Sequence, residues 1–257
     1  VVVCSEPGSE QPTGECVVEG AGAAMLISGD ILGAGTVFVG GKVGVDAAGI
    51  ITCVGCDCGE PEAGNTTRLN CSQQLVSPGL INAHDHIGWI HAYPAEWTER
   101  FDHRHDWRKG KRGHTRVSSG NSGNGDNKSW GELRQVMSGT TSISASGAGT
   151  GLMRNVDVQS GNLDLGQPAV EYDTFPLGDS GGEFRTDDCS YPDLPGLSVL
   201  SEDSWTPHVS EGIDEEARNE FLCMSSAERG GIDVTENNGA FIHGIGLMAI
   251  DGREMAA

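Results

Sequence analysis

The sequence contains few basic residues and no long apolar run. Its 16 Lys and Arg residues stand against 37 Asp and Glu residues, giving a formal net charge of -21 at pH 7. Because binding to nucleic-acid phosphates depends on Lys and Arg, we expect no nucleic-acid partner. No run of 18 or more apolar residues occurs, so we expect no transmembrane segment.

The chain is long enough for a large domain with a small companion, because its 257 residues are 37% hydrophobic. Residues 1–18 are polar and rich in Pro and Gly, which predicts a flexible N-terminal tail. Such a tail is typical of exported proteins and fits a lipid tether on a processed N-terminus, although a fragment of a longer protein would look the same. Residues 118–126 contain so few apolar side chains that we predict a mobile loop there.

Eight cysteines are many for a cytosolic enzyme, and Cys53, Cys56, Cys58 and Cys71 lie close together. Cys53 and Cys56 have the two-residue gap of a zinc knuckle, but a second Cys-x-x-Cys pair is missing. We therefore favour disulfides over zinc at these cysteines. Disulfides and an acidic, lysine-poor composition predict an extracytoplasmic location, either periplasmic or secreted.

Two patterns of secondary structure follow one another along the chain. Short β-prone runs separated by glycine turns predict a β-rich subdomain of small antiparallel strands over residues 19–75. Residues 75–83 then form a short apolar run, typical of a strand buried on both faces of a parallel sheet. Further strand candidates occur at residues 140–145, 169–175, 204–209 and 239–245, and a helix is predicted at residues 213–222.

Strands and helices that alternate at this spacing predict a parallel α/β architecture. We expect a (β/α)8 TIM-type barrel over residues 76–257, incomplete in that about six of its eight β/α units are present.

The sequence contains two His-x-His pairs. His84 and His86 end the predicted buried strand, where residues two apart face the same way, so both imidazoles point toward one place. We favour metal ligation there over a pair of hydrogen-bonded core histidines. His103 and His105 lie in a strongly charged stretch, which we interpret as a solvated or salt-bridged basic loop.

A divalent metal needs further ligands, and His208 and His243 also end predicted strands. The sequence His208-Val-Ser-Glu211 places a carboxylate just beyond the first of them, where it could transfer a proton. Either histidine alone is equally well explained as a buried, hydrogen-bonded side chain. Three strand ends that carry histidine together favour a metal site.

These segments resemble the amidohydrolase superfamily, in particular its cytosine deaminase and chlorohydrolase branch. The β-rich opening resembles the N-terminal β-sandwich piece of that family, and residues 76–86 resemble its first barrel strand with the His-x-His motif. His208-Val-Ser-Glu211 resembles the fifth-strand histidine with its acid, and Phe241-Ile-His243 resembles the sixth-strand histidine.

The resemblance implies that His84, His86 and His208 bind one divalent metal, Zn²⁺ in the first instance and Fe²⁺ as the alternative. His243 would hold the attacking water or join the ligands, and Glu211 would carry the proton to the leaving group. The implied function is a metal-dependent hydrolase that uses a metal-activated water on a C–N bond of a small cyclic or amidine-like substrate.

Two family features are absent from the sequence. After His243 the sole Asp is Asp251, which is too near to be the metal-binding Asp of the eighth barrel strand. Either the chain is a fragment or a second polypeptide supplies that residue and the last strands, and we favour the second polypeptide. The chain's lysines do not suit a carbamylated bridging ligand; they are Lys42, Lys109, Lys111 and Lys128. The alternative function is a non-catalytic exported binding or scaffold protein with a relic barrel, which metal analysis would distinguish from the enzyme.

Overall fold

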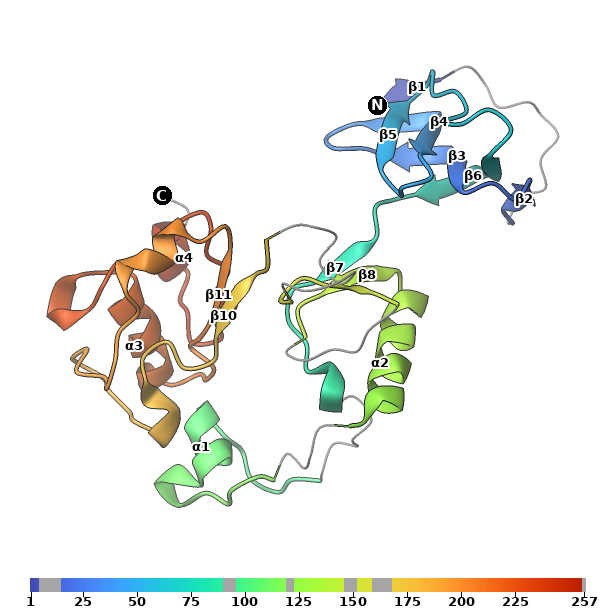
Figure 1. Cartoon of the computed structure of the whole chain (residues 1–257). Helices are drawn as coiled ribbons and strands as arrows, with labels where there is room; N and C mark the ends of the chain where they lie inside the picture. Colours follow the sequence, from blue (N-terminus) through green and yellow to red (C-terminus); the bar gives the residue numbers. More distant parts are fainter. Residues whose placement is uncertain (5–14, 90–95, 119–122, 146–151, 159–167, 256–257) are drawn as a thin grey trace. The chain divides into compact units, whose positions relative to one another are not determined.

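The computed structural model describes residues 1–4, 15–89, 96–118, 123–145, 152–158 and 168–255. The chain divides into two compact units, unit 1 from Val1 to Gly79 and unit 2 from Leu80 to Ala257 (Figure 1). In the described part of the chain, no helix is both long and apolar enough to cross a membrane.

Unit 1 is built on one mixed six-stranded sheet in the order β1-β4-β3-β6-β2, with β5 paired to β4. β3 runs antiparallel to β4 but parallel to β6, so the sheet is not the purely antiparallel one expected from the sequence. Ile31, Val43 and Val45 form its small buried core. The strands are β1 (Val2–Val3), β2 (Val17–Glu19), β3 (Ala24–Leu32), β4 (Val37–Val45), β5 (Ile51–Gly55) and β6 (Thr66–Val76).

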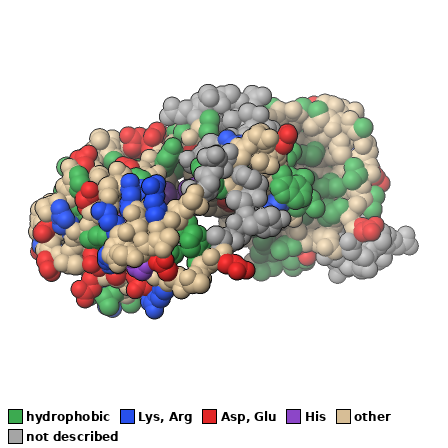
Figure 2. Space-filling model, turned by 90° about the horizontal axis from the view of Figure 1, so that it is seen from below, with side chains coloured by type: hydrophobic (Ala, Val, Ile, Leu, Met, Phe, Trp, Pro, Cys, Tyr) green, Lys and Arg blue, Asp and Glu red, His purple; other side chains and the backbone are tan. Residues whose placement is uncertain are grey.

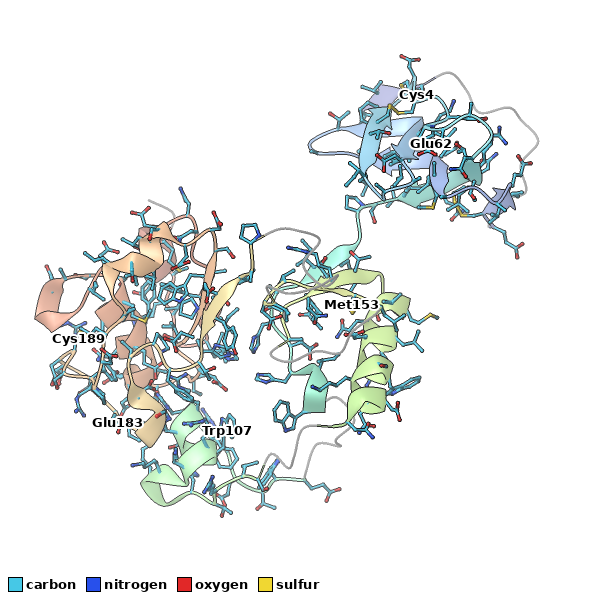
Figure 3. The ribbon with its side chains drawn as sticks, in the orientation of Figure 1. Cys4, Glu62, Trp107, Met153, Glu183 and Cys189 are labelled. Carbon is cyan, nitrogen blue, oxygen red and sulfur yellow. A yellow bond between two sulfur atoms is a disulfide. The ribbon has the colours of Figure 1, made fainter. Side chains whose placement is uncertain are left out.

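All eight cysteines form disulfides, which are drawn in yellow in Figure 3. Cys53 and Cys56 bond to different partners, so the zinc-knuckle alternative is wrong and the favoured disulfide prediction is confirmed. Four disulfides indicate an oxidising, extracytoplasmic environment. Two of them tie the segment expected to be a tail to the sheet of unit 1. The pairs are Cys4–Cys56, Cys16–Cys71, Cys53–Cys58 and Cys189–Cys223.

Unit 2 contains two separate three-stranded parallel sheets. The first has the order β7-β8-β9 and the second the order β10-β11-β12. Their strands are β7 (Leu80–Asn82), β8 (Thr140–Ile143), β9 (Arg154–Asn155), β10 (Glu171–Asp173), β11 (Trp205–Val209) and β12 (Ile242–His243). The α-helices in the described residues are α1 (Arg104–Lys109), α2 (Gly125–Met137), α3 (Glu215–Met224) and α4 (Asp251–Glu254).

The predicted (β/α)8 barrel is therefore wrong, because the described strands of unit 2 form two short sheets and no closed barrel (Figure 1). A barrel strand needs a covering helix after it. Residues 174–204, which connect β10 to β11, are rich in Gly, Pro and Asp, which form helices poorly, and they contain only short 3-10 turns. The sequence between these strands thus cannot supply the helix that a β/α unit requires.

The strand predicted over residues 75–83 is also different in the structure. β6 ends at Val76 and β7 begins at Leu80, so one predicted strand is divided between the two units. Leu80 and Ile81 are 61% and 68% exposed, so β7 is not buried on both faces as the apolar run predicted. The prediction took apolar composition as evidence for burial, which composition alone does not determine.

Two helices begin at capping residues that the sequence contains. Asp214 accepts a hydrogen bond from the Ala217 amide and so caps α3, close to the predicted helix at 213–222. Asn124 caps α2 in the same way through the Asn127 amide. Gly125 and Asp126 therefore belong to a helix, and the part of the predicted mobile loop that they form is wrong.

Candidate metal centre

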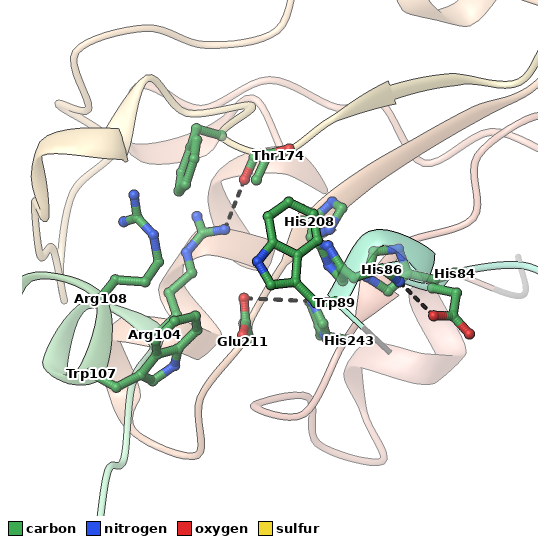
Figure 4. Close-up of a pocket in the computed structure, with 12 residues that line it drawn as sticks. His84, His86, Trp89, Arg104, Trp107, Arg108, Thr174, His208, Glu211 and His243 are labelled. Carbon is green, nitrogen blue, oxygen red and sulfur yellow. Dashed lines mark hydrogen bonds and ion pairs between the residues drawn. The ribbon is translucent and has the colours of Figure 1, made fainter. Parts of the chain in front are cut away.

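Four histidines of unit 2 lie around one point. His84 and His86 come from the loop after β7, His208 lies on β11, and His243 ends β12 (Figure 4). The ring centroid of His84 is 4.9 Å from that of His86, 4.6 Å from that of His208 and 5.4 Å from that of His243. The His208 and His243 centroids are 5.2 Å apart. The structure thus brings together all four histidines that the sequence selected.

The His84–His86 loop is held by side chains rather than by strand geometry. Both histidines follow the end of β7, instead of lying within a strand as predicted. Asp85 accepts a hydrogen bond from the His86 amide at 2.6 Å through Oδ1. Its Oδ2 accepts from Asn82 Nδ2 at 2.8 Å and from Gln135 Nε2 of α2 at 2.9 Å. Asp85 therefore links the loop to the end of β7 and to α2.

Replacing Gln135 by Ala is expected to weaken zinc binding by about tenfold, because groups that orient metal ligands typically contribute 10- to 100-fold to affinity. The change removes one of the two side-chain donors to Asp85 Oδ2 and lets the loop move. Zinc affinity by competition with a chelator measures the effect. Arg134→Ala, at a neighbouring position of α2, is the control, and equal zinc affinities in the two variants would show that the Gln135 contact does not matter.

His208 and His243 are positioned by the parallel pairing of β11 with β12. All five residues of β11 are buried, and His208 is paired with Ile242 while Val209 is paired with His243. His243 has a φ of 76°, a left-handed conformation that is uncommon outside glycine and often found at functional sites.

The donor set fits a divalent metal. One nitrogen from each of His84, His86 and His208 lies within 4.8 Å of the others, whereas nitrogens of one tetrahedral zinc site lie about 3.4 Å apart. The three rings thus need to approach one another by at most about 1.4 Å. His208 is buried and neither of its ring nitrogens has a hydrogen-bond partner of good geometry, although the Asp173 backbone is near enough to raise its pKa slightly. A buried imidazole without partners is destabilising unless something binds it.

The surroundings of His84, His208 and His243 lower their pKa values and so favour the neutral imidazole, which is the form that binds metal. Burial, followed by the neighbouring His84 and His243, lowers the pKa of His208 to about 3. Burial also lowers the pKa of His84, with a further contribution from His86, and it lowers the pKa of His243, with a further contribution from Arg104.

Glu211 lies beside His243, with 3.5 Å between Glu211 Oε2 and His243 Nε2 (Figure 4). Burial raises the pKa of Glu211, while Arg104 acts in the opposite direction. The Glu211 carbonyl accepts a hydrogen bond from the Arg104 amide at 2.9 Å, so the start of α1 holds this residue in place. A partly buried carboxylate with a raised pKa is suited to accepting and releasing a proton.

These groups face a cavity of about 960 Å³, near the upper end of the size of small-molecule sites. Trp89 and Trp107 line it, whereas Trp97, which also follows the first His-x-His pair, is exposed and packs against Phe101. The complete lining is His84, Asp85, His86, Trp89, Arg104, Trp107, Arg108, Thr174, Phe175, His208, Glu211 and His243.

Sequence reasoning missed several of these residues. Arg104 and Arg108 were grouped with a solvated basic loop, yet both line the cavity. Asp157 lines a smaller hollow of about 30 Å³ that also touches His84, His86 and His208. Their side chains are brought to the site by tertiary contacts, so no local pattern in the sequence indicates them.

His103 and His105 are buried and paired with acids, so of the two interpretations of this stretch the solvated loop is wrong and the salt-bridged one is confirmed. His103 caps α1 by accepting from the His105 amide, and its Nε2 is 3.3 Å from Glu220. His105 Nε2 is 2.8 Å from Asp179. These three groups, His103, His105 and Glu220, also lie within 4.8 Å of one another, but the adjacent Arg104 guanidinium already supplies the positive charge there. We therefore assign this cluster a structural role.

No family model and no curated protein matches the chain. Among solved structures, the crystal structure of A. niger ochratoxinase aligns with a TM-score of 0.35 and 14% sequence identity. The alignment covers 74% of this chain but 47% of ochratoxinase, so the chain spans about half the length of that protein. A likeness this distant carries no argument about fold or function, and the interpretation of the site therefore rests on its own geometry.

Proposed function

We propose that this protein is a metal-dependent hydrolase and that His84, His86 and His208 hold one divalent cation. The observation that supports the proposal most strongly is the convergence of three imidazoles on a cavity, one of them buried without a hydrogen-bond partner of good geometry. Three protein ligands with an open fourth position are typical of catalytic zinc sites. Zn²⁺ suits three imidazoles, and Fe²⁺ is the alternative.

A divalent cation at such a site lowers the pKa of bound water to about 7 and polarises the bond under attack. Glu211 then accepts the proton of the attacking water while the new C–O bond forms. As the C–N bond breaks, Glu211 returns the proton to the leaving nitrogen, so that one water is added across the bond. His243 stands beside Glu211, where it positions the water or adds a further ligand.

The substrate class that we propose is a small cyclic or amidine-like compound with a hydrolysable C–N bond. The cavity supports this size, and Trp89 and Trp107 offer flat apolar surfaces to a ring. An Asp supplied to the metal by a second polypeptide stays a prediction. Asp251 does not take that role, because Arg218 binds both of its carboxylate oxygens.

Glu211→Gln tests the proposal in zinc-loaded protein. Loss of the proton carrier is expected to lower kcat by about 10²- to 10⁴-fold with zinc content unchanged. The assay follows release of ammonia or amine from cyclic amidines, cyclic ureas and N-acyl amines. Glu202→Gln, at an exposed position, is the matched control. Hydrolysis that is equally fast in both variants, or absent from wild-type protein that holds zinc, would contradict the proposed function.

A further inference from the structure

Many basic residues of this acidic chain lie in one stretch, and two of them, Arg104 and Arg108, line the cavity. Seven of the 16 Lys and Arg residues lie between positions 100 and 116, a stretch that includes α1. Figure 2 shows blue Lys and Arg side chains gathered on one face of unit 2, among many acidic ones. A chain of net charge -21 repels anions, so a cluster of Lys and Arg within it needs a physical explanation.

Several of these cations are neutralised by acids of the same chain. Arg104 is paired with Asp179 and Glu220. Arg112 is paired with Asp106, Asp214 and Glu216, and Arg100 is paired with Asp102. These arginines are therefore explained by the fold itself.

Arg108 differs, because no carboxylate of the described residues lies within 4.0 Å of its guanidinium. One Nη is 3.2 Å from His105 Nδ1, and the other donates to the Ser180 carbonyl at 3.4 Å. The guanidinium lies over the Phe175 ring, 4.2 Å from its centroid. A guanidinium has five donors in a planar fork, so these two contacts leave donor capacity at the cavity wall.

Arg108 lies among aromatic side chains and apart from the four histidines of the candidate metal centre. Trp107, Trp89 and Phe175 line the same cavity. In the view of Figure 4, Arg108 and Trp107 lie on the opposite side of the pocket from His84, with Glu211 between them. A ligand that reached from the histidines to Arg108 would therefore pass Glu211 and the aromatic surfaces.

We propose that Arg108 binds a carboxylate of the substrate, and that the substrate carries a planar ring between this carboxylate and the bond that is hydrolysed. This inference rests on the proposed function. A guanidinium matches a carboxylate with two parallel hydrogen bonds, and flat rings stack on Trp and Phe. Glu211 and Asp85 in the same lining repel a dianion such as phosphate more strongly than a singly charged carboxylate, so one negative charge suits the site better than two.

The test compares binding of 2-naphthoate with that of its neutral amide, 2-naphthamide, by isothermal titration calorimetry. We expect wild-type protein to bind the carboxylate at least tenfold more tightly, with and without zinc. Arg108→Gln is expected to remove this preference, and Arg108→Lys to retain part of it. Arg100→Gln changes an exposed arginine outside the cavity lining and is expected to retain the full preference.

A carboxylate preference that survives in Arg108→Gln, or equal affinity of wild-type protein for the two probes, overturns the inference. A preference seen only with zinc and kept in Arg108→Gln means that the cation binds the carboxylate, which also overturns it. Zinc content is measured in the same samples. Wild-type protein that binds no zinc would contradict the proposed function without affecting the Arg108 result. Circular dichroism confirms that each variant is folded.

Discussion

Replacing Arg104 by Met is expected to lower the free energy of unfolding by about 3–5 kcal/mol, which is the usual effect of removing one partner of a buried ion pair. Arg104 is 1% exposed, and its Nη2 lies 2.5 Å from Asp179 and 3.5 Å from Glu220. Both carboxylates are also buried, so the substitution leaves two negative charges in the interior, with His103, His105 and the Ser210 amide among their remaining partners.

The same network connects stability to the site. The Arg104 amide holds the Glu211 carbonyl, and Glu220 accepts a hydrogen bond from the Ser210 amide at 2.9 Å. The amide of residue 104 is kept in Arg104→Met, so the substitution acts on the site through Glu220, which loses its Arg104 partner and holds the Ser210 amide beside Glu211. Denaturant unfolding followed by tryptophan fluorescence measures the loss in the free energy of unfolding.

Arg100→Met is the matched control for this prediction. Arg100 pairs with Asp102 at 2.7 Å, but its side chain is 75% exposed, so solvent screens the interaction. We expect its loss to cost only a small fraction of the Arg104 effect. Equal losses in the two variants would mean that the buried network contributes no more than a surface pair.

The effect of Arg104→Met also depends on pH. Burial raises the pKa of Asp179, but the hydrogen bond from His105 and the charge of Arg104 outweigh burial and hold the pKa below its usual value. A carboxylate with a lowered pKa in the folded state stabilises the fold above its ordinary pKa of 3.8, and this contribution declines as the pH falls further. The difference between wild type and Arg104→Met should therefore be full at neutral pH and shrink in acid.

Replacing His208 by Ala is expected to lower zinc affinity at least a hundredfold, or by about 3 kcal/mol, because one of three protein donors is lost. Without metal, the buried imidazole has no hydrogen-bond partner of good geometry and therefore destabilises the fold. Removing it takes this unfavourable contribution away. We therefore expect His208→Ala to change the stability of the metal-free protein little, in contrast to Arg104→Met.

Thermal unfolding with and without zinc separates these effects. Zinc at 1,000 times its Kd stabilises wild-type protein by about 4 kcal/mol through mass action, and His208→Ala should show no comparable rise in Tm. His114→Ala is the control, because His114 is partly exposed and bound to Glu99. If zinc raised the Tm of His208→Ala as much as that of wild type, His208 would not be a ligand.

The sequence predicted the elements that carry the site better than it predicted their assembly. Strand candidates at residues 204–209 and 239–245 contain β11 and β12, and the placement of His208 and His243 at their ends followed from local apolar patterns. Whether parallel strands close into a barrel depends on the helices between them. The connection from β10 to β11 is rich in Gly, Pro and Asp and contains no α-helix in the described residues. The prediction gave this composition too little weight.

Long-range contacts explain the other errors. The charged neighbours of His105 in the sequence indicated a solvated or salt-bridged residue, but they could not identify its partner Asp179, which lies 74 residues away. The role of Asp85 likewise depends on Gln135, which lies 50 residues further along the chain. Disulfide formation could be predicted from the cysteine number, but the pairs could not, because Cys4 and Cys56 meet only through the folding of the β-sheet.

The most direct test of the proposed metal centre is X-ray diffraction from zinc-loaded crystals with anomalous data collected on both sides of the zinc absorption edge. We expect one strong anomalous peak about 2.0–2.1 Å from a ring nitrogen of each of His84, His86 and His208. A peak between His103, His105 and Glu220 instead, or rings of these three ligands turned away from any common ion, would contradict the proposed site.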